Sequence, residues 1–502
     1  MAKLKDYNGH FCESDFEYAF IGFLEKEGWN YLAGNKINRV TKNDVLIADD
    51  FKAFISKINN NLTDDEVTQI FDNVRLVGAE NDFATLHKIY GWMVDGVQFT
   101  PQNGLPQMVN LIDFENPDNN IFRVVNQFTV EYMNNGQKEN RRPDVLLFVN
   151  GMPLCVIELK NPGDAHATVF NAWEQINIRY WRDIPHLLHY CPLACISDGV
   201  KTRLGTVRTP YEHFYAWRRV NDSDEVSTMQ FAETETMIKG VYSPTRFIEL
   251  FRDYIYFQDT IYDHEEVEIV CRYPQFFAAK LLKQSIVNSI VAGSGKGGTY
   301  FGATGCGKTY TMAFLARQLA LRCTNIPAIG SPTIILIVDR EELQKQGAKL
   351  FTKSKEFLNL GEVSTVKNRK QLREELGARQ SGGFYICTIQ KFCDREDDKI
   401  GLINDRKNII CFSDEAHRTQ LEHSKKIQFS KDADENMKAM VSKPYAKVLK
   451  EAFPQATFVG FTGTPIAETY QTFGEEIDRY TMDQAVAYCA YQISSSYCKG
   501  IT

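Results

Sequence analysis

The chain has 502 residues, of which 43% are hydrophobic. At roughly 150 residues per domain it has room for about three domains, and this composition excludes disorder over most of its length. Lys and Arg total 57 against 64 Asp and Glu, and the formal net charge is −7. That charge excludes a uniformly basic nucleic-acid coat protein, although it leaves room for a local basic groove.

Twelve cysteines are scattered along the chain, and none forms a CxxC pair. The closest are Cys191/Cys195 and Cys387/Cys393, and neither pair has histidines at zinc-finger spacing. We therefore expect reduced thiols rather than a disulfide framework or a zinc site. The N-terminus carries no apolar signal-peptide core, and no apolar run reaches the ~18 residues of a membrane span. These features predict a soluble, cytoplasmic protein without a membrane partner.

The first predicted element is an amphipathic helix over residues 13–28, in which aromatic and aliphatic residues recur at spacings of three and four from Phe16 to Leu24. Ser14 as N-cap and Glu17 three residues later predict a capping box. Glu17 is also a candidate metal ligand, but the cap explains it more simply.

Strands are predicted next, over residues 122–125, 128–132, 145–149 and 154–159, and a helix over residues 165–180. The polar, acidic segment 221–235 is the best linker or excursion in the first half of the chain. Ser243-Pro244 then has the N-cap and N1 signature of a new helix.

After about residue 260 short apolar strands alternate with helical stretches, which predicts a parallel α/β sheet. The expected strands are residues 334–338, 384–388, 409–412 and 457–461. The predicted fold class is therefore α/β, with a mixed sheet flanked by helices before a boundary near residue 255 and a parallel sheet after it. The predicted divisions are 1–255, 256–470 and 471–502.

A glycine-rich stretch fits the phosphate-loop pattern G-x-x-x-x-G-K-[ST]. It reads Gly302-Ala303-Thr304-Gly305-Cys306-Gly307-Lys308-Thr309. A predicted strand precedes it and a predicted helix follows, so its backbone N–H groups can converge on phosphate oxygens. Lys308 is expected to reach the β- and γ-phosphates, and the Thr309 hydroxyl to ligate Mg²⁺. In the nearby glycine-rich stretch Lys296 is followed by Gly, so we expect a flexible loop there.

An acidic pair, Asp414-Glu415, follows the apolar run 409–412. Asp414 at the end of a strand can hold Mg²⁺, and Glu415 can polarise an attacking water. His417 can couple a nucleotide site to a neighbouring element. Alone, such a pair is most often a solvated strand end, but downstream of a phosphate loop we interpret it as functional.

Asp144, Glu158 and Lys160 form a PD…(D/E)xK pattern. Its chemistry needs two carboxylates on a divalent metal, and a Lys that positions or activates the attacking water and offsets phosphate charge. Glu158 and Lys160 share one face of a strand because they are two residues apart. Downstream, Gln175 and Tyr180 lie on the predicted helix, which can fold back over the site. Gln175 can then hold DNA or the Lys, or simply lie on the helix surface.

The loop between the two strands decides which residue faces Asp144. A strict two-residue turn at Asn150-Gly151 pairs residue 149 with 152 and places Asp144 opposite Ile157. A three-residue loop pairs residue 149 with 153 and places Asp144 opposite Glu158. We predict the three-residue loop, because Gly151 suits its left-handed position.

Several short motifs in the second half resemble those of superfamily 2 helicases. Thr462-Gly463-Thr464-Pro465 resembles motif III, residues 334–346 resemble the Ia region, and residues 388–392 the next DNA-side motif. Gln275 stands where this family places an adenine-reading Gln; the alternative is a helix-surface residue. The resemblance implies a RecA-like ATPase domain with a DEAH box (residues 414–417) that binds Mg²⁺ and ATP.

A nuclease pattern followed by a motor resembles the restriction (R) subunit of type I restriction–modification systems, over roughly residues 10–485. The resemblance implies a PD-(D/E)xK endonuclease domain in which Asp144, Glu158 and Lys160 cut double-stranded DNA. It also implies ATP-dependent translocation in a complex with methylation (M) and specificity (S) subunits. The family's Gln-x-x-x-Tyr motif has one residue more here, between Gln175 and Tyr180, which leaves the role of Tyr180 open. Cys306 stands where Ser is common.

The family continues into a second RecA-like domain with an arginine finger, whereas only a short tail follows Pro465 here. We therefore expect a fragment, an early-terminated product or a naturally short form. Two other functions remain open: a stand-alone repair-type nuclease–helicase, and a non-catalytic product that binds only nucleotide, DNA or partner subunits.

Overall fold

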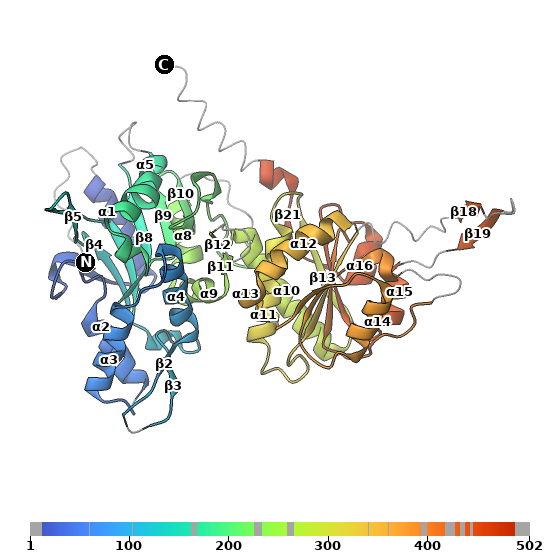
Figure 1. Ribbon diagram of the computed structural model, residues 1–502. Coiled ribbons are helices and arrows are strands. Elements are labelled where there is room, and N and C mark those ends of the chain that lie inside the picture. The colour runs from blue at the N-terminus through green and yellow to red at the C-terminus, as the bar shows by residue number, and fades with distance from the viewer. Residues whose placement is uncertain are drawn as a thin grey trace, which may run out of the picture. The chain divides into compact units, whose positions relative to one another are not determined.

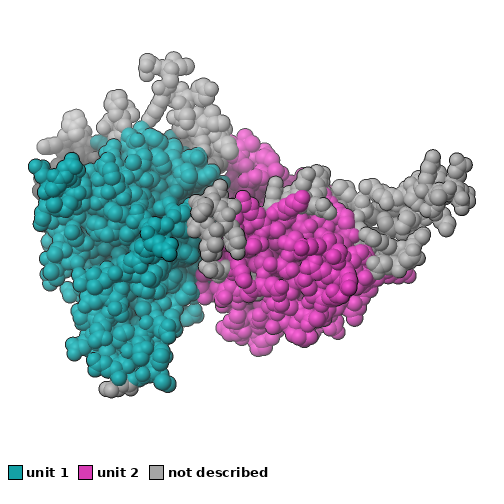
Figure 2. Space-filling model, in the orientation of Figure 1, with its two compact units in different colours: residues 1–273 teal, residues 274–502 magenta. Residues whose placement is uncertain are grey.

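The structure is a computed structural model. It describes residues 13–59, 61–102, 104–161, 168–224, 233–258, 266–339, 341–359, 361–392, 399–416, 427–431, 437–441 and 445–486. His417 and the tail from residue 487 lie outside these residues. In the described part of the chain no helix is both long and apolar enough to cross a membrane. The chain divides into two compact units, residues 1–273 and 274–502 (Figure 2).

The division at residue 273 falls later than the boundary that we expected near residue 255. An antiparallel hairpin of β11 (Ile255–Gln258) and β12 (Val267–Val270) lies between the two positions. Thr206 on β10 of the N-terminal sheet donates a hydrogen bond to the carbonyl of Glu268 on β12, at 3.4 Å. The hairpin therefore belongs to the N-terminal unit, and the change of sequence pattern came before the end of that unit.

A six-stranded mixed sheet forms the centre of the N-terminal unit, in the order β1-β4-β7-β8-β9-β10 (Figure 1). β1 pairs in parallel with β4 and β8 with β9, and the other neighbours are antiparallel. The strands are β1 (Asn30–Ala33), β4 (Phe122–Asn126), β7 (Val145–Val149), β8 (Met152–Leu159), β9 (Leu193–Ser197) and β10 (Thr202–Thr206). Two separate ribbons pair β2 (Val97–Phe99) with β3 (Gln107–Val109) and β5 (Val130–Asn134) with β6 (Gln137–Arg141).

The N-terminal unit also contains short and medium-length helices. They are α1 (Glu13–Lys26), α2 (Ala48–Ile58), α3 (Asp64–Arg75), α4 (Asp82–Asp95), α5 (Val169–Glu174), α6 (Trp181–Asp183), α7 (Pro185–Leu188), α8 (Glu233–Val241) and α9 (Pro244–Asp253). Of the predicted helix 165–180, residues 165–167 lie outside the described residues, and α5 begins at Val169 after Thr168 as N-cap. The last residues of the predicted helix, Gln175–Tyr180, form a π-helix. Within the polar segment 221–235, α8 begins at Glu233, and the unit continues on both sides, so the segment is no domain linker.

The expected capping box at the start of α1 is wrong. The helix begins at Glu13, so Ser14 lies inside its first turn rather than at the N-cap. The pattern S-x-x-E matched a cap, but the side chain of Glu17 faces the end of β4 instead, where it accepts hydrogen bonds from Asn126 and Gln127. The expected start of α9 is correct, with Pro244 as its first residue.

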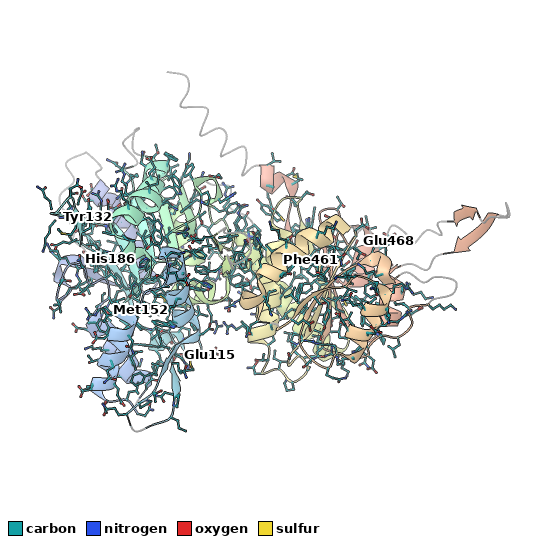
Figure 3. The ribbon with its side chains drawn as sticks, viewed as in Figure 1. Glu115, Tyr132, Met152, His186, Phe461 and Glu468 are labelled. Carbon is teal, nitrogen blue, oxygen red and sulfur yellow. The ribbon has the colours of Figure 1, made fainter. Side chains whose placement is uncertain are left out.

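β7 and β8 are buried at every position, and Glu158 is the one charged residue in either strand (Figure 3 labels Met152, where β8 begins). A strand that is covered on both faces is expected to read as a continuous apolar run. A carboxylate in such a strand costs free energy unless a partner compensates it. The position of Glu158 therefore needs an explanation beyond folding.

The hairpin between β7 and β8 corrects the predicted loop. Asn150 and Gly151, with φ of 52° and 77°, form a strict two-residue turn in which Val149 pairs with Met152. Positive φ at both positions is what a type I′ turn requires. The predicted three-residue loop is therefore wrong.

A β-bulge in β8 then changes the register by one residue. Phe148 pairs with Pro153, but Leu147 pairs with Cys155, so Leu154 is the extra residue. Pro153 has no N–H to donate, and a bulge is a place where a sheet tolerates it. Beyond the bulge Val145 pairs with Ile157. One step further, this register sets Asp144 opposite Glu158, which is the pairing that we expected from the wrong loop.

The second unit is built on a seven-stranded sheet in the order β15-β16-β14-β17-β20-β13-β21, and all its neighbours are parallel. This confirms the predicted parallel sheet. The strands are β13 (Lys296–Gly302), β14 (Thr333–Val338), β15 (Val363–Thr365), β16 (Phe384–Thr388), β17 (Ile409–Asp414), β20 (Thr457–Thr462) and β21 (Glu476–Tyr480). A separate ribbon pairs β18 (Ile427–Lys431) with β19 (Met437–Val441).

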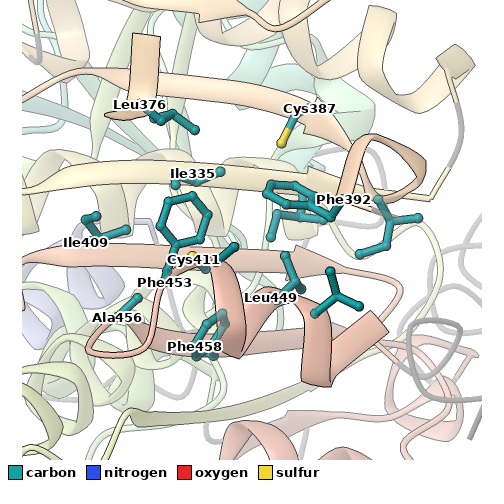
Figure 4. Packing of buried hydrophobic residues seen from close by; sticks show 14 of the residues in the cluster. Ile335, Leu376, Cys387, Phe392, Ile409, Cys411, Leu449, Phe453, Ala456 and Phe458 are labelled. Atoms are coloured by element: carbon teal, nitrogen blue, oxygen red, sulfur yellow. The ribbon is translucent and has the colours of Figure 1, made fainter. Parts of the chain in front are cut away.

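Helices cover both faces of this parallel sheet (Figure 1). They are α10 (Tyr273–Ala292), α11 (Lys308–Arg322), α12 (Glu341–Lys353), α13 (Lys355–Leu358), α14 (Arg369–Ala378), α15 (Tyr445–Ala452) and α16 (Ala467–Phe473). Under α14 and α15, a buried cluster joins Ile335 and Cys411 of the sheet to Leu376, Leu449 and Phe453 (Figure 4). Each fully buried large apolar side chain contributes about 1.5–3 kcal/mol, so this cluster fixes the strands that carry the loops.

Of the glycine-rich stretch that we expected to be a flexible loop, residues 293–295 do connect α10 to β13, but from Lys296 on the stretch is the start of β13. Gly298, with φ of 106°, lies where a Cβ atom would come within 2.2 Å of Ile477 Cγ1. Glycine is required there because β21 packs closely against β13. At Gly297 and Gly298 the glycines of this stretch thus reflect close packing in the sheet.

Candidate functional site

Three side chains selected from the sequence meet where β7 begins and β8 ends. Asp144 Oδ2 accepts a hydrogen bond from the backbone N–H of Leu159 at 2.8 Å. Lys160 Nζ lies 3.8 Å from Glu158 Oε2. We call the group Asp144, Glu158, Lys160, Gln175 and Tyr180 the hairpin site.

Glu158 is fully buried at this site. Burial raises the pKa of Glu158 well above its ordinary value, and the nearby Asp144 carboxyl raises that pKa further, while Lys160 and the Tyr180 hydroxyl lower it. Glu158 Oε1 accepts a hydrogen bond from the Tyr180 hydroxyl at 2.5 Å, and among the residues that the structure describes Oε2 has no hydrogen-bond partner. A buried carboxylate oxygen without a donor, beside a second carboxyl, is an arrangement that a cation would stabilise.

The donor set at the hairpin site suits one divalent ion. Among the residues that the structure describes, no group of three or more His, Cys, Asp or Glu side chains is placed to hold a metal. The site offers two carboxylates, and Mg²⁺ is commonly bound through one or two carboxylates because it keeps several of its waters. Asp144 and Glu158 therefore fit Mg²⁺ better than a metal that needs an all-protein cage.

Lys160 is connected to Glu158 by a closed chain of side chains. Lys160 Nζ donates to Gln175 Oε1 at 3.1 Å, and Gln175 Nε2 donates to the Tyr180 hydroxyl at 2.8 Å. The Tyr180 hydroxyl in turn donates to Glu158. Of the roles that the sequence left open for Gln175, the structure shows the contact with the Lys.

Glu17, for which a metal ligand was the alternative to a helix cap, is linked to this site through Gln127. Its two carboxylate oxygens accept hydrogen bonds from Asn126 Nδ2 at 2.6 Å and from Gln127 Nε2 at 2.8 Å. The backbone N–H of Gln127 donates to the carbonyl of Asp144 at 3.3 Å. Gln127 has a φ of 53°, which is uncommon for a residue other than glycine. Glu17 thus supports the backbone beside Asp144, and sequence reasoning missed Asn126 and Gln127.

In the second unit the phosphate-loop residues connect β13 to α11 as predicted. Gly305 and Gly307 have φ of 82° and 86°, which residues with a side chain rarely adopt. Lys308 Nζ donates to the carbonyl of Gly302 at 3.3 Å and lies 3.6 Å from Glu415 Oε1. Thr309 lies half-buried in the first turn of α11. The backbone N–H groups that begin this helix form a ready anion site.

The loop is also held by one hydrogen bond within it and one to a neighbouring strand. The backbone N–H of Cys306 donates to the carbonyl of Ala303 at 3.1 Å, and the N–H of Ala303 donates to the carbonyl of Tyr480 at 2.8 Å. Thr304 is exposed at the outer side of the loop. Sequence reasoning gave no role to Tyr480, since it lies far along the chain on an edge strand.

Gln275 is buried against the phosphate loop, so the alternative of a helix-surface residue is wrong. Its Nε2 donates to the carbonyl of Gly307 at 3.5 Å. A Cβ atom at Gly307 would lie 2.5 Å from that nitrogen, so only glycine fits beside Gln275. Gln275 therefore lies directly against the phosphate loop, at Gly307.

Asp414 ends β17, and Glu415 follows it next to Lys308. Burial raises the pKa of Asp414, and the charge of Glu415 acts in the same direction, whereas the charge of Lys308 lowers that pKa. The backbone N–H of Glu415 donates to Asp414 Oδ1 at 3.0 Å. Glu415 has a φ of 48°, and strained backbone of this kind gathers at functional sites. His417, the remaining candidate here, lies outside the described residues.

The segment that resembles motif III lies beside the phosphate loop. Thr462 ends β20 fully buried, and its Oγ1 accepts a hydrogen bond from the backbone N–H of Thr464 at 3.1 Å. A Cβ atom at Gly463 would lie 3.4 Å from the carbonyl of Gly302 and 3.5 Å from Thr304 Oγ1. The structure thus brings these sequence candidates to one end of the parallel sheet.

Two family models match the chain, one in each unit. The model for the N terminus of the type I restriction enzyme R protein matches residues 11–213. The model for the SWI2/SNF2 ATPase matches residues 274–491. The second match begins at the residue where the structure divides the chain.

The chain is similar to curated proteins over most of its own length. The type I restriction enzyme HindI endonuclease subunit of Haemophilus influenzae is 30% identical over 499 residues, which cover 94% of this chain and 45% of that protein. The type I restriction enzyme MjaIXP endonuclease subunit of Methanocaldococcus jannaschii is 28% identical, and the match covers 93% of this chain and 44% of that protein. A type I restriction enzyme endonuclease subunit of Staphylococcus aureus (strain MSSA476) is 24% identical, with 89% and 42% covered.

The chain spans about half the length of the curated relatives it matches. Among solved structures, a fragment of an HsdR subunit from Vibrio vulnificus YJ016 aligns with a TM-score of 0.27 at 15% identity, covering 73% of this chain and 56% of that one. The two family matches follow one another in the order that the motifs predicted, and the relatives match across both. Over the part that it shares with them, the chain belongs to the family of endonuclease (R) subunits of type I restriction enzymes.

Proposed function

We propose that the chain contributes two activities to a type I restriction enzyme. The N-terminal unit, as a PD-(D/E)xK nuclease domain, cleaves double-stranded DNA, and the second unit, as a RecA-like domain, uses ATP to drive translocation. Both act in a complex with methylation and specificity subunits. The observation that carries the proposal is the meeting of Asp144 and Lys160 with the fully buried Glu158, whose Oε2 has no hydrogen-bond partner within the described part of the chain.

At the hairpin site, Asp144 and Glu158 would hold Mg²⁺. A bound Mg²⁺ supplies Lewis-acid polarisation of the phosphate and of the attacking water. Lys160 offsets the negative charge that develops on the phosphate as water attacks and the P–O bond to the leaving oxygen breaks. Because Lys160 also donates to the carbonyl of Leu159 at 3.1 Å and to Gln175, its ammonium group is oriented before DNA arrives.

At the phosphate loop, the backbone from Gly302 to Gly307 would cradle the phosphates of ATP, and Lys308 would neutralise them. Thr309 and Asp414 would hold Mg²⁺, and Glu415 would orient the attacking water. Gln275 would read the adenine while it contacts Gly307. Thr462 and Thr464, which lie against the loop through Gly463, would report the state of the nucleotide to the DNA-binding side.

The test uses the chain co-expressed with its cognate methylation and specificity subunits and a supercoiled plasmid that carries the target sequence. Glu158→Ala and Lys160→Ala should abolish nicking in Mg²⁺ and ATP and leave ATP hydrolysis unchanged. Lys308→Ala should abolish both activities, since cleavage depends on translocation. If Glu158→Ala lowers ATP hydrolysis together with nicking, the hairpin is a structural element and the nuclease assignment is wrong.

A further inference from the structure

Gln175 and Tyr180 are five residues apart, which an α-helix does not place on one face. Successive residues of an α-helix turn by about 100°, so residues five apart point about 140° away from each other. In a π-helix the backbone bonds run from i to i+5 and each turn holds more residues, so residues five apart lie much closer to one face than in an α-helix. Residues Gln175–Tyr180 form a π-helix, and the two side chains are hydrogen-bonded at 2.8 Å.

The helix on both sides of the π turn is fixed to the segment that follows β10. Trp173 Nε1 donates to the carbonyl of Thr209 at 2.9 Å, and Trp181 Nε1 to the carbonyl of Val207 at 2.8 Å. Within the turn, Asn177 Nδ2 donates to both carbonyls at 3.0 Å. The two ends therefore cannot rotate to absorb an extra residue.

The extra residue is accommodated on the outer side of the turn. Ile178 is 50% exposed, so it lies on the side of the turn that faces solvent. Ile176 and Tyr180, which face the sheet, are fully buried. The turn thus widens toward solvent, and the face toward Glu158 keeps its alignment.

We propose that this π turn is a positioning device for the hairpin site, an inference that rests on the proposed nuclease function. Through the turn, Tyr180 donates to Glu158 Oε1 and leaves Oε2 for the metal. Gln175 holds Lys160 Nζ at 3.1 Å, closer than the 3.8 Å to Glu158 Oε2, and so keeps the ammonium from occupying the place of the metal. Tyr180 and Gln175 are positioning residues, since they act through Glu158 and Lys160.

The first test separates positioning from folding. Tyr180→Phe removes only the hydroxyl, so it should raise the Mg²⁺ concentration for half-maximal nicking about 10–100-fold, the usual effect of losing a hydrogen bond to a metal ligand. Mn²⁺ titration of the purified chain by calorimetry should show the same loss of affinity without any partner subunit. The matched control is Tyr190→Phe, which removes a buried hydroxyl that donates to the carbonyl of Val74 at 2.7 Å. An equal metal dependence in Tyr180→Phe and wild type would overturn the proposal.

The second test changes the register. Deletion of Ile178 restores a four-residue spacing, so the turn should become α-helical and nicking should stay within a few-fold of wild type. Insertion of one Ala after Ile178 should lower nicking at least tenfold, because no regular turn then aligns Gln175 with Tyr180. If the deletion folds and is inactive, the π turn is not the device. If the deletion does not fold, the Tyr180→Phe titration decides alone.

These outcomes are distinct from failure of the proposed function. If the wild-type complex does not nick DNA in Mg²⁺ and ATP, or if Glu158→Ala nicks normally, the nuclease assignment itself is wrong. If the wild type nicks and Glu158→Ala does not, but Tyr180→Phe keeps the wild-type metal dependence, only the role of the π turn is wrong.

Discussion

Asp144 Oδ2 accepts a hydrogen bond at 2.8 Å from the backbone N–H of Leu159, the residue that follows Glu158. This bond joins the residue directly before β7 to the last residue of β8. A buried backbone N–H needs an acceptor, and the Asp144 carboxylate supplies it. Asp144 therefore has a structural role beside its proposed metal-binding role, and substitutions can separate the two.

Asp144→Asn keeps an acceptor oxygen for Leu159 but removes the negative charge, so it should abolish nicking and leave the free energy of unfolding nearly unchanged. Asp144→Ala removes the acceptor as well and should lower the free energy of unfolding by about 1–3 kcal/mol. Urea denaturation and plasmid nicking measure the two effects. Nicking at the wild-type rate by Asp144→Asn would exclude Asp144 as a metal ligand.

The turn that sets the register of this hairpin should be unusually sensitive. Gly151→Ala introduces a Cβ atom 2.2 Å from the carbonyl oxygen of Ile47, at a φ of 77°. Gly136→Ala is the matched control, because Gly136 has a φ of 81° but no atom within 4 Å of the added Cβ. The control should cost about 1–2 kcal/mol for the left-handed conformation alone. Gly151→Ala should cost clearly more in urea denaturation, and equal costs would show that the turn can move away from α2.

The sequence predicted most where the signal was local. The phosphate loop and the apolar strands that support the second unit are patterns of a few residues, and the structure has them in place. The hairpin register was predicted for the wrong reason, because two local features offset each other. The turn is one residue shorter than predicted, and the bulge adds one unpredicted residue, Leu154, to β8. Pro153 inside an apolar strand was the signal that locates the bulge.

Contacts between distant residues explain the remaining errors. Glu17 matched a capping box with Ser14, yet its partners Asn126 and Gln127 lie 109 and 110 residues away along the chain. No local pattern reports such a contact. The spacing of Gln175 and Tyr180 left the role of Tyr180 open, because a π turn has no recognised sequence signature and depends on the packing around it.

The buried Glu268 should make the stability of the N-terminal unit depend on pH. Burial raises the pKa of Glu268 well above its ordinary value. The Thr206 hydroxyl and the Arg208 charge lower that pKa, but by less than burial raises it. The fold therefore favours the protonated carboxyl. The contribution of the protonated carboxyl to the free energy of unfolding is complete below the unfolded pKa of about 4.3, and it is lost as the pH rises through the folded pKa.

Glu268→Gln stays neutral at every pH, so it should stabilise the N-terminal unit relative to wild type, by more at pH 8 than at pH 5. Thermal denaturation of both proteins at the two pH values measures the difference. Glu212→Gln is a suitable control, because Glu212 is exposed. A stabilisation that does not change between pH 5 and pH 8 would mean that Glu268 is ionised in the folded chain throughout this range.

Lys308 of the phosphate loop should be needed for nucleotide binding, whereas Lys296 of the other glycine-rich stretch should not. Lys308 Nζ lies between the carbonyl of Gly302, at 3.3 Å, and Glu415 Oε1, at 3.6 Å, so its charge already faces the loop that would hold the phosphates. Lys296 is exposed at the opposite end of β13. At about 3.3 Å per residue the strand separates Lys296 from Gly302, and so from the end of Lys308, by roughly 20 Å.

Lys308→Ala should weaken binding of Mg²⁺·ATP to the purified chain roughly ten- to a hundred-fold, because a hydrogen bond to a charged group contributes about 1.5–3 kcal/mol. Lys296→Ala should bind as wild type does. Glu415→Gln should keep the binding, since it removes only the partner that Lys308 leaves when phosphates arrive, but it should lose hydrolysis. Titration with a fluorescent ATP analogue, followed by a phosphate-release assay, measures both properties. Equal weakening by Lys296→Ala and Lys308→Ala would mean that the nucleotide binds along β13 rather than at the phosphate loop.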